Sequence, residues 1–427
     1  MIWPFRRRVS AAAPVAPAPV YAGPEQAART APRRPGSVFT PTQPRQGARS
    51  LTGRSAELTR ILQALGDEQA HVVLYSERGR GKTSLANAAV ERLRQGGTVV
   101  ARYSCEADST FDSIMLGLVR NLPPFLMPGW AEAGEGCEAA LPAGAIRPDD
   151  VAALPARLDC RDLVFVVDEF DRVTNQSATA RMADTIKQIS DRSVPLRFLI
   201  VGVSENLEQM LGQHLSIQRN IAAVQLPLLQ DAEVAEIISA GSTAVGVPVP
   251  VDVVARAVLL ARGNPHLSQL LGLRLMQATE MRNGAVASAE DFNMAVDTLI
   301  REASPADSGL WTGLTANGTD AEMALALRRL ATAEQDRWGR IFAPAEPAGG
   351  VRLGEHGIEA GLWQRIEVSG ILRPVPAGSG LWVFRQRSLM HYILMLATRM
   401  LGNADVATRP LGAPEPSDRT QAYMALR

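Results

Sequence analysis

Cysteine is scarce in this sequence. Only three of the 427 residues are cysteines, Cys105, Cys137 and Cys160, and no two of them form a C-x-x-C pair. An odd number without metal-ligand spacing argues against a disulfide framework and against a zinc site. It is typical of a protein from a reducing compartment.

An excess of charge and long apolar runs are absent as well. Lys plus Arg and Asp plus Glu both number 44, so no net field draws the chain to nucleic acid or to a membrane. No apolar run reaches the roughly 20 residues that a membrane-spanning helix requires. The apolar start precedes the arginines of residues 6–8 and prolines follow, unlike a signal peptide. We therefore expect a cytoplasmic protein with no membrane span.

What is present is an ordinary globular composition, 46% hydrophobic and 21% charged, in a chain long enough for two or three domains. Residues 1–48 are rich in Pro, Ala and Arg, which predicts a disordered tail. The tail is either purely solvated or, through its arginines, in weak contact with nucleic acid or anionic lipid. Residues 403–427 read as a second, flexible tail.

Residues 49–226 predict an α/β domain. A helix with Leu58, Ile61 and Leu65 at helical spacing comes first, and buried strands then alternate with amphipathic helices. Apolar strands separated by helices indicate a parallel sheet covered on both faces. The segment 127–156, rich in Gly, Ala and Pro, reads as a surface insertion. The strands are expected at 71–76, 98–105, 163–169, 196–203 and 221–227, and the helices that follow the first four at 82–95, 109–122, 179–192 and 206–215.

The rest of the chain predicts two further units. Residues 227–303 contain four helical patterns and no strand, which indicates an all-α bundle. Residues 304–318 then read as a break of Gly, Ser, Pro and Asn. Within 304–402, helices followed by two short strands around a Gly-rich turn make a winged-helix candidate.

The stretch between the first strand and its helix matches a phosphate-binding loop, G-x-x-x-x-G-K-[ST], except at its first letter. Such a loop closes its backbone N–H groups around phosphates, and the following helix directs its N-terminal dipole at the anion. Lys82 can reach the β- and γ-phosphate oxygens, and the Thr83 hydroxyl can ligate Mg²⁺. The candidate nucleotide-binding residues of this loop are Ser76, Glu77, Arg78, Gly79, Arg80, Gly81, Lys82, Thr83 and Ser84.

The departure lies at Ser76, where the pattern has glycine. A serine would cost about 1 kcal/mol if the position required a positive φ. It removes no phosphate ligand, since Gly79 and Gly81 stand nearest the lysine. We therefore expect the loop to retain nucleotide binding.

Asp168 and Glu169 end another apolar strand. From this position Asp168 can hold Mg²⁺ through water, and Glu169 can polarise an attacking water. The alternative is a merely polar strand end, which a preceding phosphate loop makes the weaker interpretation. The pair favours hydrolysis over binding alone.

Two further segments supply catalytic candidates. Ser204, Glu205 and Asn206 end the strand expected between the first two, where one polar group can contact the γ-phosphate or the water, and the sequence does not choose among them. Each can equally form a plain capped turn. Arg219 precedes the last strand and is either a finger reaching a neighbouring subunit's γ-phosphate or a surface arginine in a local ion pair.

These pieces, in this order, resemble the AAA+ class of P-loop ATPases, in its origin-recognition-type and STAND-like branch. "LTGRSAEL" resembles the box that lies against the adenine, which implies roles for Gly53 and Arg54. "ARGNPHLSQLL" resembles the second-sensor helix of a lid, which implies nucleotide contacts for Pro265 and His266. The resemblance implies ATP and Mg²⁺, a helical lid over 227–303 and a homo-oligomer.

His266 departs from the family pattern, because many AAA+ proteins carry an arginine there that touches the γ-phosphate. A neutral imidazole donates one hydrogen bond but no fixed charge near pH 7. Lid closure would then sense the γ-phosphate more weakly. His266 can equally be a packed residue at a helix start.

Three functions remain open. An ATP-driven switch would couple the nucleotide state to a protein partner through the winged helix, whereas a DNA-binding initiator or loader would grip duplex DNA with it. A scaffold that barely hydrolyses is disfavoured by the intact Lys82, Asp168 and Glu169. The candidates for DNA contact are Arg365, Arg373, Arg385 and Arg387, although alternation with Trp363, Trp382 and Phe384 also fits a half-buried hairpin. We favour the switch.

Overall fold

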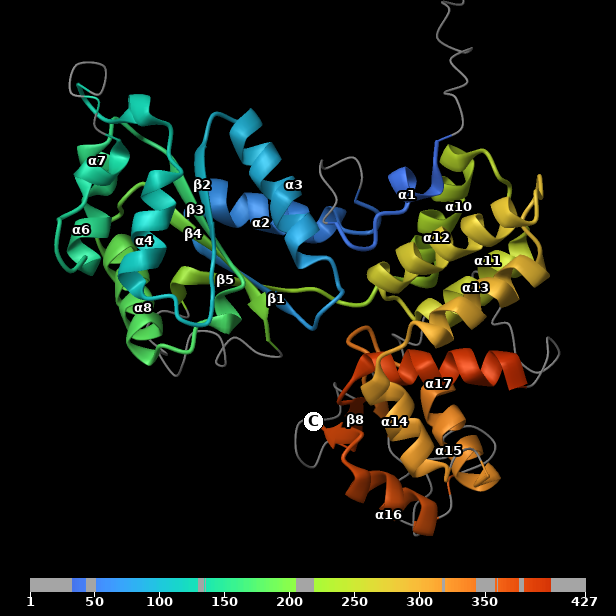
Figure 1. Ribbon diagram of the computed structural model, residues 1–427. Helices are drawn as coiled ribbons and strands as arrows, with labels where there is room; N and C mark the ends of the chain where they lie inside the picture. Colours follow the sequence, from blue (N-terminus) through green and yellow to red (C-terminus); the bar gives the residue numbers. More distant parts are fainter. Residues whose placement is uncertain are drawn as a thin grey trace, which may run out of the picture.

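The structure is a computed structural model of the whole chain. It describes residues 33–43, 51–129, 134, 136–204, 219–316, 319–342, 358, 360–375 and 380–400. An α/β core, a helical bundle and a smaller C-terminal unit follow one another along the chain, and the bundle and the C-terminal unit lie together on one side of the core (Figure 1).

The core contains a five-stranded parallel sheet in the order β2-β3-β4-β1-β5. This agrees with the predicted fold class, and β4 lies between β1 and β3 as expected. The strands are β1 (His71–Ser76), β2 (Val99–Ser104), β3 (Leu163–Asp168), β4 (Leu196–Val203) and β5 (Ile221–Gln225). The main helices are α2 (Ser55–Gly66), α3 (Lys82–Gln95), α4 (Phe111–Arg120) and α8 (Gln176–Asp191).

Both faces of the sheet are covered, because successive side chains of a strand point to opposite faces. Val72 and Leu74 of β1 pack with α2 and α3 in one apolar cluster. Val73, between them, packs in the cluster that contains α4 and α8. The continuous apolar strands of the sequence reflect this two-sided burial.

The segment expected as a surface insertion contributes to the second of these clusters. It forms η4 (Cys137–Ala140), α6 (Pro148–Ala152) and α7 (Leu154–Arg157), after η3 (Pro124–Leu126). Val151 and Leu154 are fully buried. Its high Ala and Pro content therefore belongs to short, packed helices.

The bundle consists of the four predicted helices, α10 (Asp231–Val245), α11 (Val251–Ala261), α12 (Pro265–Met281) and α13 (Ala289–Arg301). A segment from the predicted N-terminal tail packs on it. Here α1 (Pro35–Val38) leads into Phe39, whose fully buried ring fills the space left by Gly241 of α10 and Gly272 of α12. Composition alone did not show that one aromatic residue would fix residues 33–43 to the bundle.

The C-terminal unit, predicted over 304–402, begins with a helix in place of the break predicted at 304–318. Helix α14 (Pro305–Leu314) occupies most of this segment, with Ser304 as its N-cap. The two predicted strands are joined by a third, giving a sheet in the order β6-β8-β7. The other elements are α15 (Ala321–Thr332), β6 (Ile341–Phe342), α16 (Ala360–Ser369), β7 (Leu372–Pro374), β8 (Leu381–Phe384) and α17 (Arg387–Met400). The winged-helix assignment stays a prediction.

One apolar cluster runs through both the bundle and the C-terminal unit. It includes Val296 and Leu299 of α13 together with Ile393 and Leu394 of α17, all buried. Helix α17 lies between the bundle and the rest of the C-terminal unit (Figure 1). These two units therefore pack as one body, although the sequence pattern separates them.

Over the part of the chain that the structure describes, no helix combines the length and the apolarity needed to cross a membrane.

Candidate nucleotide-binding site

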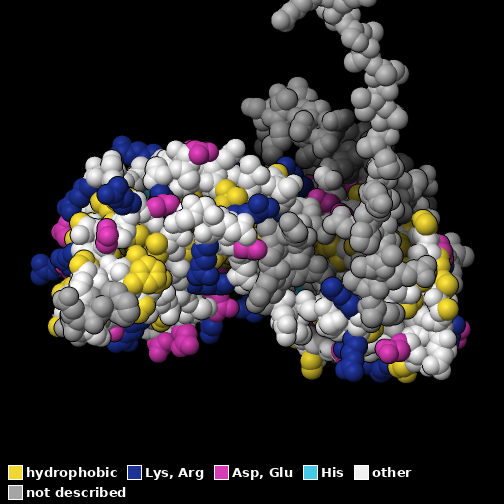
Figure 2. Space-filling model, turned by 90° about the horizontal axis from the view of Figure 1, so that it is seen from above, with side chains coloured by type: hydrophobic (Ala, Val, Ile, Leu, Met, Phe, Trp, Pro, Cys, Tyr) yellow, Lys and Arg dark blue, Asp and Glu magenta, His cyan; other side chains and the backbone are white. Residues whose placement is uncertain are grey.

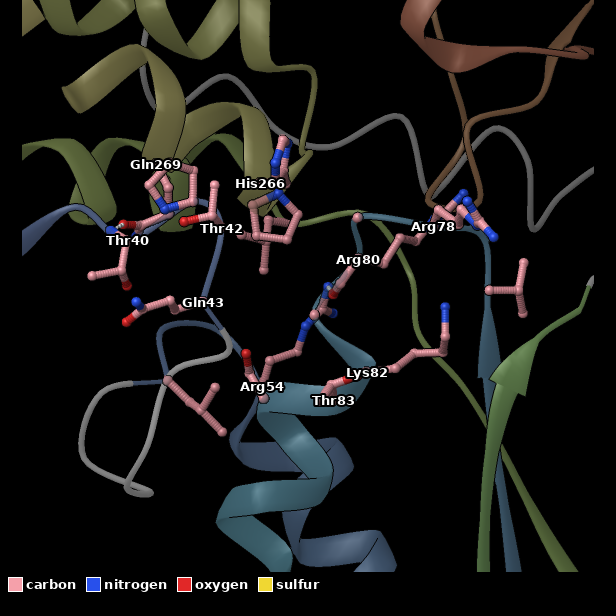
Figure 3. A pocket seen from close by; sticks show the side chains of 18 of the residues that line it. Thr40, Thr42, Gln43, Arg54, Arg78, Arg80, Lys82, Thr83, His266 and Gln269 are labelled. Carbon is pink, nitrogen blue, oxygen red and sulfur yellow. Dashed lines mark hydrogen bonds between the residues drawn. The ribbon is translucent and has the colours of Figure 1, made fainter. Parts of the chain in front are cut away.

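A cavity of about 490 Å³ lies between the core and the bundle. Its volume is in the range of ordinary small-molecule sites. Figure 3 shows Lys82 and Thr83 at the start of α3, with His266 and Gln269 of α12 across the cavity. Of the predicted site residues, those that line it are Arg54, Arg78, Gly79, Arg80, Gly81, Lys82, Thr83, Ser84, Asp168, Glu169, Pro265 and His266.

The loop between β1 and α3 owes its shape to its glycines. Gly79 and Gly81 have φ angles of 78° and 90°, which L side chains rarely adopt. Helix α3 starts directly after its N-cap, Gly81, which has no side chain to cap the first turn. The N–H groups at the N-terminus of a helix and the helix dipole make a ready site for an anion.

Ser76, the residue that departs from the motif, causes no backbone strain. It is not among the described non-glycine residues with positive φ, and it forms the last pair of β1 with Val203 of β4. Its buried hydroxyl donates to the carbonyl of Glu77 at 3.0 Å. The cost considered above therefore does not arise here. Ser76 and Glu77 support the loop from behind and do not line the cavity.

Lys82 is held against this loop. Its Nζ donates to the carbonyls of Ser76 and Glu77 at 2.9 and 2.8 Å. Burial lowers the pKa of Lys82 to about 8, although the nearby carboxylates of Asp171 and Asp168 act in the opposite direction. The side chain is only 9% exposed and lines the cavity. A polyanion there would supply the negative charge that these uncharged acceptors do not provide.

Asp168 and Thr83 offer a magnesium site. Both line the cavity, and carboxylate and hydroxyl oxygens suit this hard cation. Asp168 is 4% exposed, and one of its carboxylate oxygens forms an ion pair with Arg102 of β2. The other oxygen accepts from the backbone N–H of Glu169 at 2.9 Å. The donor set thus fits Mg²⁺, in competition with the guanidinium of Arg102.

Glu169 has a strained backbone. Its φ of 54° lies in the left-handed region, which is uncommon for a residue other than glycine. Strain of this kind costs of order 1–3 kcal/mol and clusters at active sites. The carboxylate lines the cavity, is 49% exposed and accepts from Arg172 at 2.8 Å. Its conformation directs a carboxylate to the rim of the cavity.

Of the remaining catalytic candidates, the two that the structure describes, Ser204 and Arg219, do not line the cavity. Ser204 is buried beyond the end of β4 but does not line the cavity, and Glu205 and Asn206 lie outside the described residues. Arg219 is 74% exposed and pairs with Asp191 at 3.6 Å. This is the local ion pair considered above, and a role toward a neighbouring subunit stays a prediction.

The bundle approaches the loop at the start of α12. Asn264 caps this helix by accepting from the N–H of Leu267 at 3.1 Å. A Cβ placed on Gly79 would stand 3.6 Å from the Cβ of His266. Burial lowers the pKa of His266, so the neutral imidazole dominates near pH 7. The start of the lid helix thus lies beside the loop and lines the same cavity, without a fixed positive charge at His266, and nucleotide contacts by Pro265 and His266 stay a prediction.

Arg54 joins the P-loop to the segment that leads from β5 to the bundle. It is 5% exposed and donates to the carbonyls of Pro227 and Arg80 at 2.8 and 3.3 Å. Gly53, in contrast, does not line the cavity, because its Cα faces the Glu233 carboxylate of α10.

Sequence reasoning missed one wall of the cavity. Thr40, Pro41, Thr42 and Gln43 line it directly after the buried Phe39. The N–H of Thr40 donates to the side chain of Gln269 at 3.3 Å, which fixes the segment to α12. Phe39 is one of four aromatic residues in 1–48, and nothing in the local sequence distinguishes it as an anchor.

The glycine loop, the lysine at the helix start and the acidic strand end define this core as a P-loop nucleotide-binding domain. Residues 65–211 match the family model described as an AAA domain. This part of the chain is therefore an AAA+ P-loop domain, and the recognition made from its motifs is confirmed.

Solved structures of similar arrangement include the Walker-type ATPase PABY2304 of Pyrococcus abyssi (15% identity, 84% of this chain and 99% of that one, TM-score 0.48). ORC2 of Aeropyrum pernix is similar at 16% identity, over 86% and 98% of the two chains, with a TM-score of 0.48. The RuvB branch migration motor of Thermotoga maritima is similar at 15% identity, over 82% and 97%, with a TM-score of 0.41. No match was found among curated proteins. Likenesses of this degree carry no activity over to this chain.

Proposed function

We propose that the protein binds and hydrolyses ATP with Mg²⁺ and acts as a nucleotide-driven switch. One observation carries the proposal: the P-loop, the acidic strand end and the first turn of the lid helix α12 all line a single cavity. A ligand in this cavity touches both the core and the bundle. Whether the ligand is bound, and whether it is hydrolysed, therefore changes the contacts between the core and the bundle.

Binding relies on the start of α3. The N–H groups after Gly79 and Gly81 receive the phosphates, and Lys82 turns from the loop carbonyls to the β- and γ-phosphate oxygens. Thr83 and Asp168 hold the metal side of the nucleotide. When bound there, Mg²⁺ neutralises charge on the phosphate oxygens as the terminal phosphoryl group leaves.

Hydrolysis is assigned to Glu169. Its carboxylate stands at the rim of the cavity, where it can orient a water and accept a proton from it. The left-handed backbone at this position supports the assignment, since local strain is retained where a side chain must be directed. Asn206 or Ser204 would contact the γ-phosphate or this water, and Arg219 of a neighbouring subunit would complete the site in a homo-oligomer.

The DNA-loader alternative gains little support from the C-terminal arginines. Arg387 is buried and faces the P-loop, and Arg365 pairs with Asp320 at 2.9 Å. Trp363 of α16 and Trp382 of β8 meet edge to face with ring centroids 5.3 Å apart, so these aromatic side chains pack the helix against the strand. Over the described surface in Figure 2, basic and acidic side chains are interspersed. We therefore favour a protein partner. Three free, buried cysteines are typical of a reducing compartment, which favours the cytoplasm as the place of this contact.

Steady-state ATP hydrolysis with and without duplex DNA tests this function, with Glu169→Gln as the inactive reference. The switch predicts Mg²⁺-dependent turnover that exceeds the reference and is indifferent to DNA. A rate that rises severalfold with DNA would favour the loader. Turnover by Glu169→Gln equal to that of the wild type would refute the role given to Glu169.

A further inference from the structure

The C-terminal unit makes a direct polar contact with the P-loop. The carboxylate of Glu77, in the loop itself, pairs with Arg387, the first residue of α17. These residues are 310 positions apart in the sequence. The same Glu77 oxygen accepts from Arg80 of the loop at 2.8 Å. One carboxylate thus bridges an arginine of the loop and an arginine of the C-terminal unit.

A second acceptor closes the cluster. The backbone carbonyl of Trp338, in the turn between α15 and β6, accepts from both Arg80 and Arg387 at 2.8 Å. The carboxylate of Asp336 fixes this turn by accepting from the N–H groups of Trp338 and Arg340 at 2.9 and 2.8 Å. Two guanidinium groups and two acceptors therefore form one closed arrangement, which we call the Glu77 cluster.

The two arginines of the Glu77 cluster are largely buried, Glu77 itself is 26% exposed, and the cluster carries a net positive charge. The side chains of Arg80 and Arg387 are 4% and 10% exposed. Burial raises the pKa of Glu77, but Arg387 and Arg80 outweigh this and leave the pKa lowered. Two positive charges against one negative charge therefore stand beside a loop built for phosphate. Removing Arg387 would remove one of the positive charges that face the Glu77 carboxylate.

The Glu77 cluster is not optimised for stability alone. The Nε of Arg80 and the Nη1 of Arg387 are buried without a hydrogen-bond partner. Buried donors without an acceptor are unfavourable, so an apolar contact would stabilise the docking of the two units more strongly. A costly polar contact at the edge of a binding site is better explained by that site.

Glu77 also links this contact to the phosphate site. Its side chain receives Arg387, while its backbone carbonyl receives the ammonium group of Lys82 at 2.8 Å. When Lys82 turns toward a phosphate, the backbone carbonyl of Glu77 loses this hydrogen bond. The same residue holds the first turn of α17.

We propose that Arg387 is a positioning residue for the nucleotide, which orients the P-loop through Glu77 and couples nucleotide binding to the docking of the C-terminal unit. The inference rests on the proposed nucleotide binding and adds that the C-terminal unit completes the site. Coupling of this kind is reciprocal: the docked unit strengthens binding, and the nucleotide strengthens docking.

The test compares ADP affinity by calorimetry in the wild type and in Arg387→Ala. We expect Kd to rise by about tenfold, within the usual range of coupling between sites. The matched control is Arg399→Ala, at the other end of the same helix, where Arg399 pairs with Asp297 of the bundle and not with the loop. The control should change Kd by less than about twofold.

A double-mutant cycle separates positioning from a loss of structure. In a Glu77→Gln background the acceptor of Arg387 has lost its charge, so Arg387→Ala should add little to the rise in Kd. Equal effects of Arg387→Ala in both backgrounds would overturn the inference. Hydrogen exchange adds a second readout: ADP should protect peptides of residues 381–395 in the wild type but not in Arg387→Ala.

Gly339→Ala provides a variant that leaves every charge in place. Gly339 has a φ of 81°, and the guanidinium of Arg387 lies where its Cβ would be. The added methyl should displace Arg387 and raise the ADP Kd as well, which keeps the test open if Arg387→Ala does not fold. Wild-type protein that fails to bind ADP would refute the proposed function. Wild-type binding with unchanged affinity in the folded variants would refute this inference alone.

Discussion

Because the pKa of Lys82 is lowered to about 8, we predict that nucleotide affinity depends on pH between about pH 7 and pH 9. Burial lowers its pKa to about 8, from an ordinary value above 10. The side chain is 9% exposed, and its hydrogen bonds go to uncharged oxygens of Ser76 and Glu77. A bound polyphosphate would place negative charge beside it and keep it protonated. The free protein therefore loses this proton at a lower pH than the complex does.

The magnitude follows from the fraction of protonated Lys82 in the free protein. With a pKa of about 8, this fraction is about 0.9 at pH 7 and about 0.1 at pH 9. If the complex stays protonated over this range, Kd rises by roughly tenfold, which is about 1.4 kcal/mol. Because the complex requires the protonated form of Lys82, the affinity is highest at and below about pH 7 and weakens as the pH rises through about 8.

Calorimetric titration with ADP between about pH 7 and pH 9 measures this dependence, and the heats in buffers of different ionisation enthalpy report the proton taken up. Lys82→Arg is the control, because a guanidinium group stays charged throughout. Its affinity will differ from that of the wild type, but the pH slope should vanish. A flat wild-type profile, or an equal slope in Lys82→Arg, would refute the reasoning.

Three further predictions concern the lid, the metal and the anchor of the N-terminal segment. Phe39→Ala should cost about 3–5 kcal/mol in the unfolding of the bundle and weaken nucleotide binding, since residues 40–43 line the cavity; unchanged urea midpoint and Kd would contradict this. Asp291, whose pKa the side-chain hydrogen bond from Arg282 lowers to about 2, contributes stability that is present above about pH 4 and lost as the pH falls toward 2. Asp291→Asn should therefore lower the free energy of unfolding in urea by about 2 kcal/mol at neutral pH and by less at acid pH. An equal loss at both pH values would count against the ion pair. Arg102→Gln, which frees a carboxylate oxygen of Asp168, should lower the Mg²⁺ concentration for half-maximal ATP turnover; an unchanged or raised value would show that Arg102 does not compete with the metal.

The core was predictable because each of its signals is local. Buried strands and amphipathic helices alternate with their own periods, and His71–Ser76 and Leu196–Val203 form strands at the predicted bounds. The loop glycines required no knowledge of the tertiary structure, since Gly79 and Gly81 adopt the positive φ that only glycine accepts readily. Parallel strands then place Asp168 and the loop at the same edge of the sheet.

The features that were missed depend on contacts between distant parts of the chain. Phe39 fills a gap between two glycines that are more than 200 residues further along, and no local pattern predicts this. The sequence pattern made Arg387 a candidate for DNA contact, yet its side chain pairs with Glu77 and is largely buried. The helix Pro305–Leu314 was hidden by its Gly, Ser and Pro content, which lowers helix propensity without preventing a helix that packs against α17.

ATP binding and turnover by three proteins, the wild type, Lys82→Ala and Glu169→Gln, test the central claim most directly. The account predicts that the wild type hydrolyses ATP with Mg²⁺, that Lys82→Ala does not bind it, and that Glu169→Gln binds it and retains it unhydrolysed. Binding of ATP by Lys82→Ala with the affinity of the wild type would contradict the claim that this cavity is the nucleotide site.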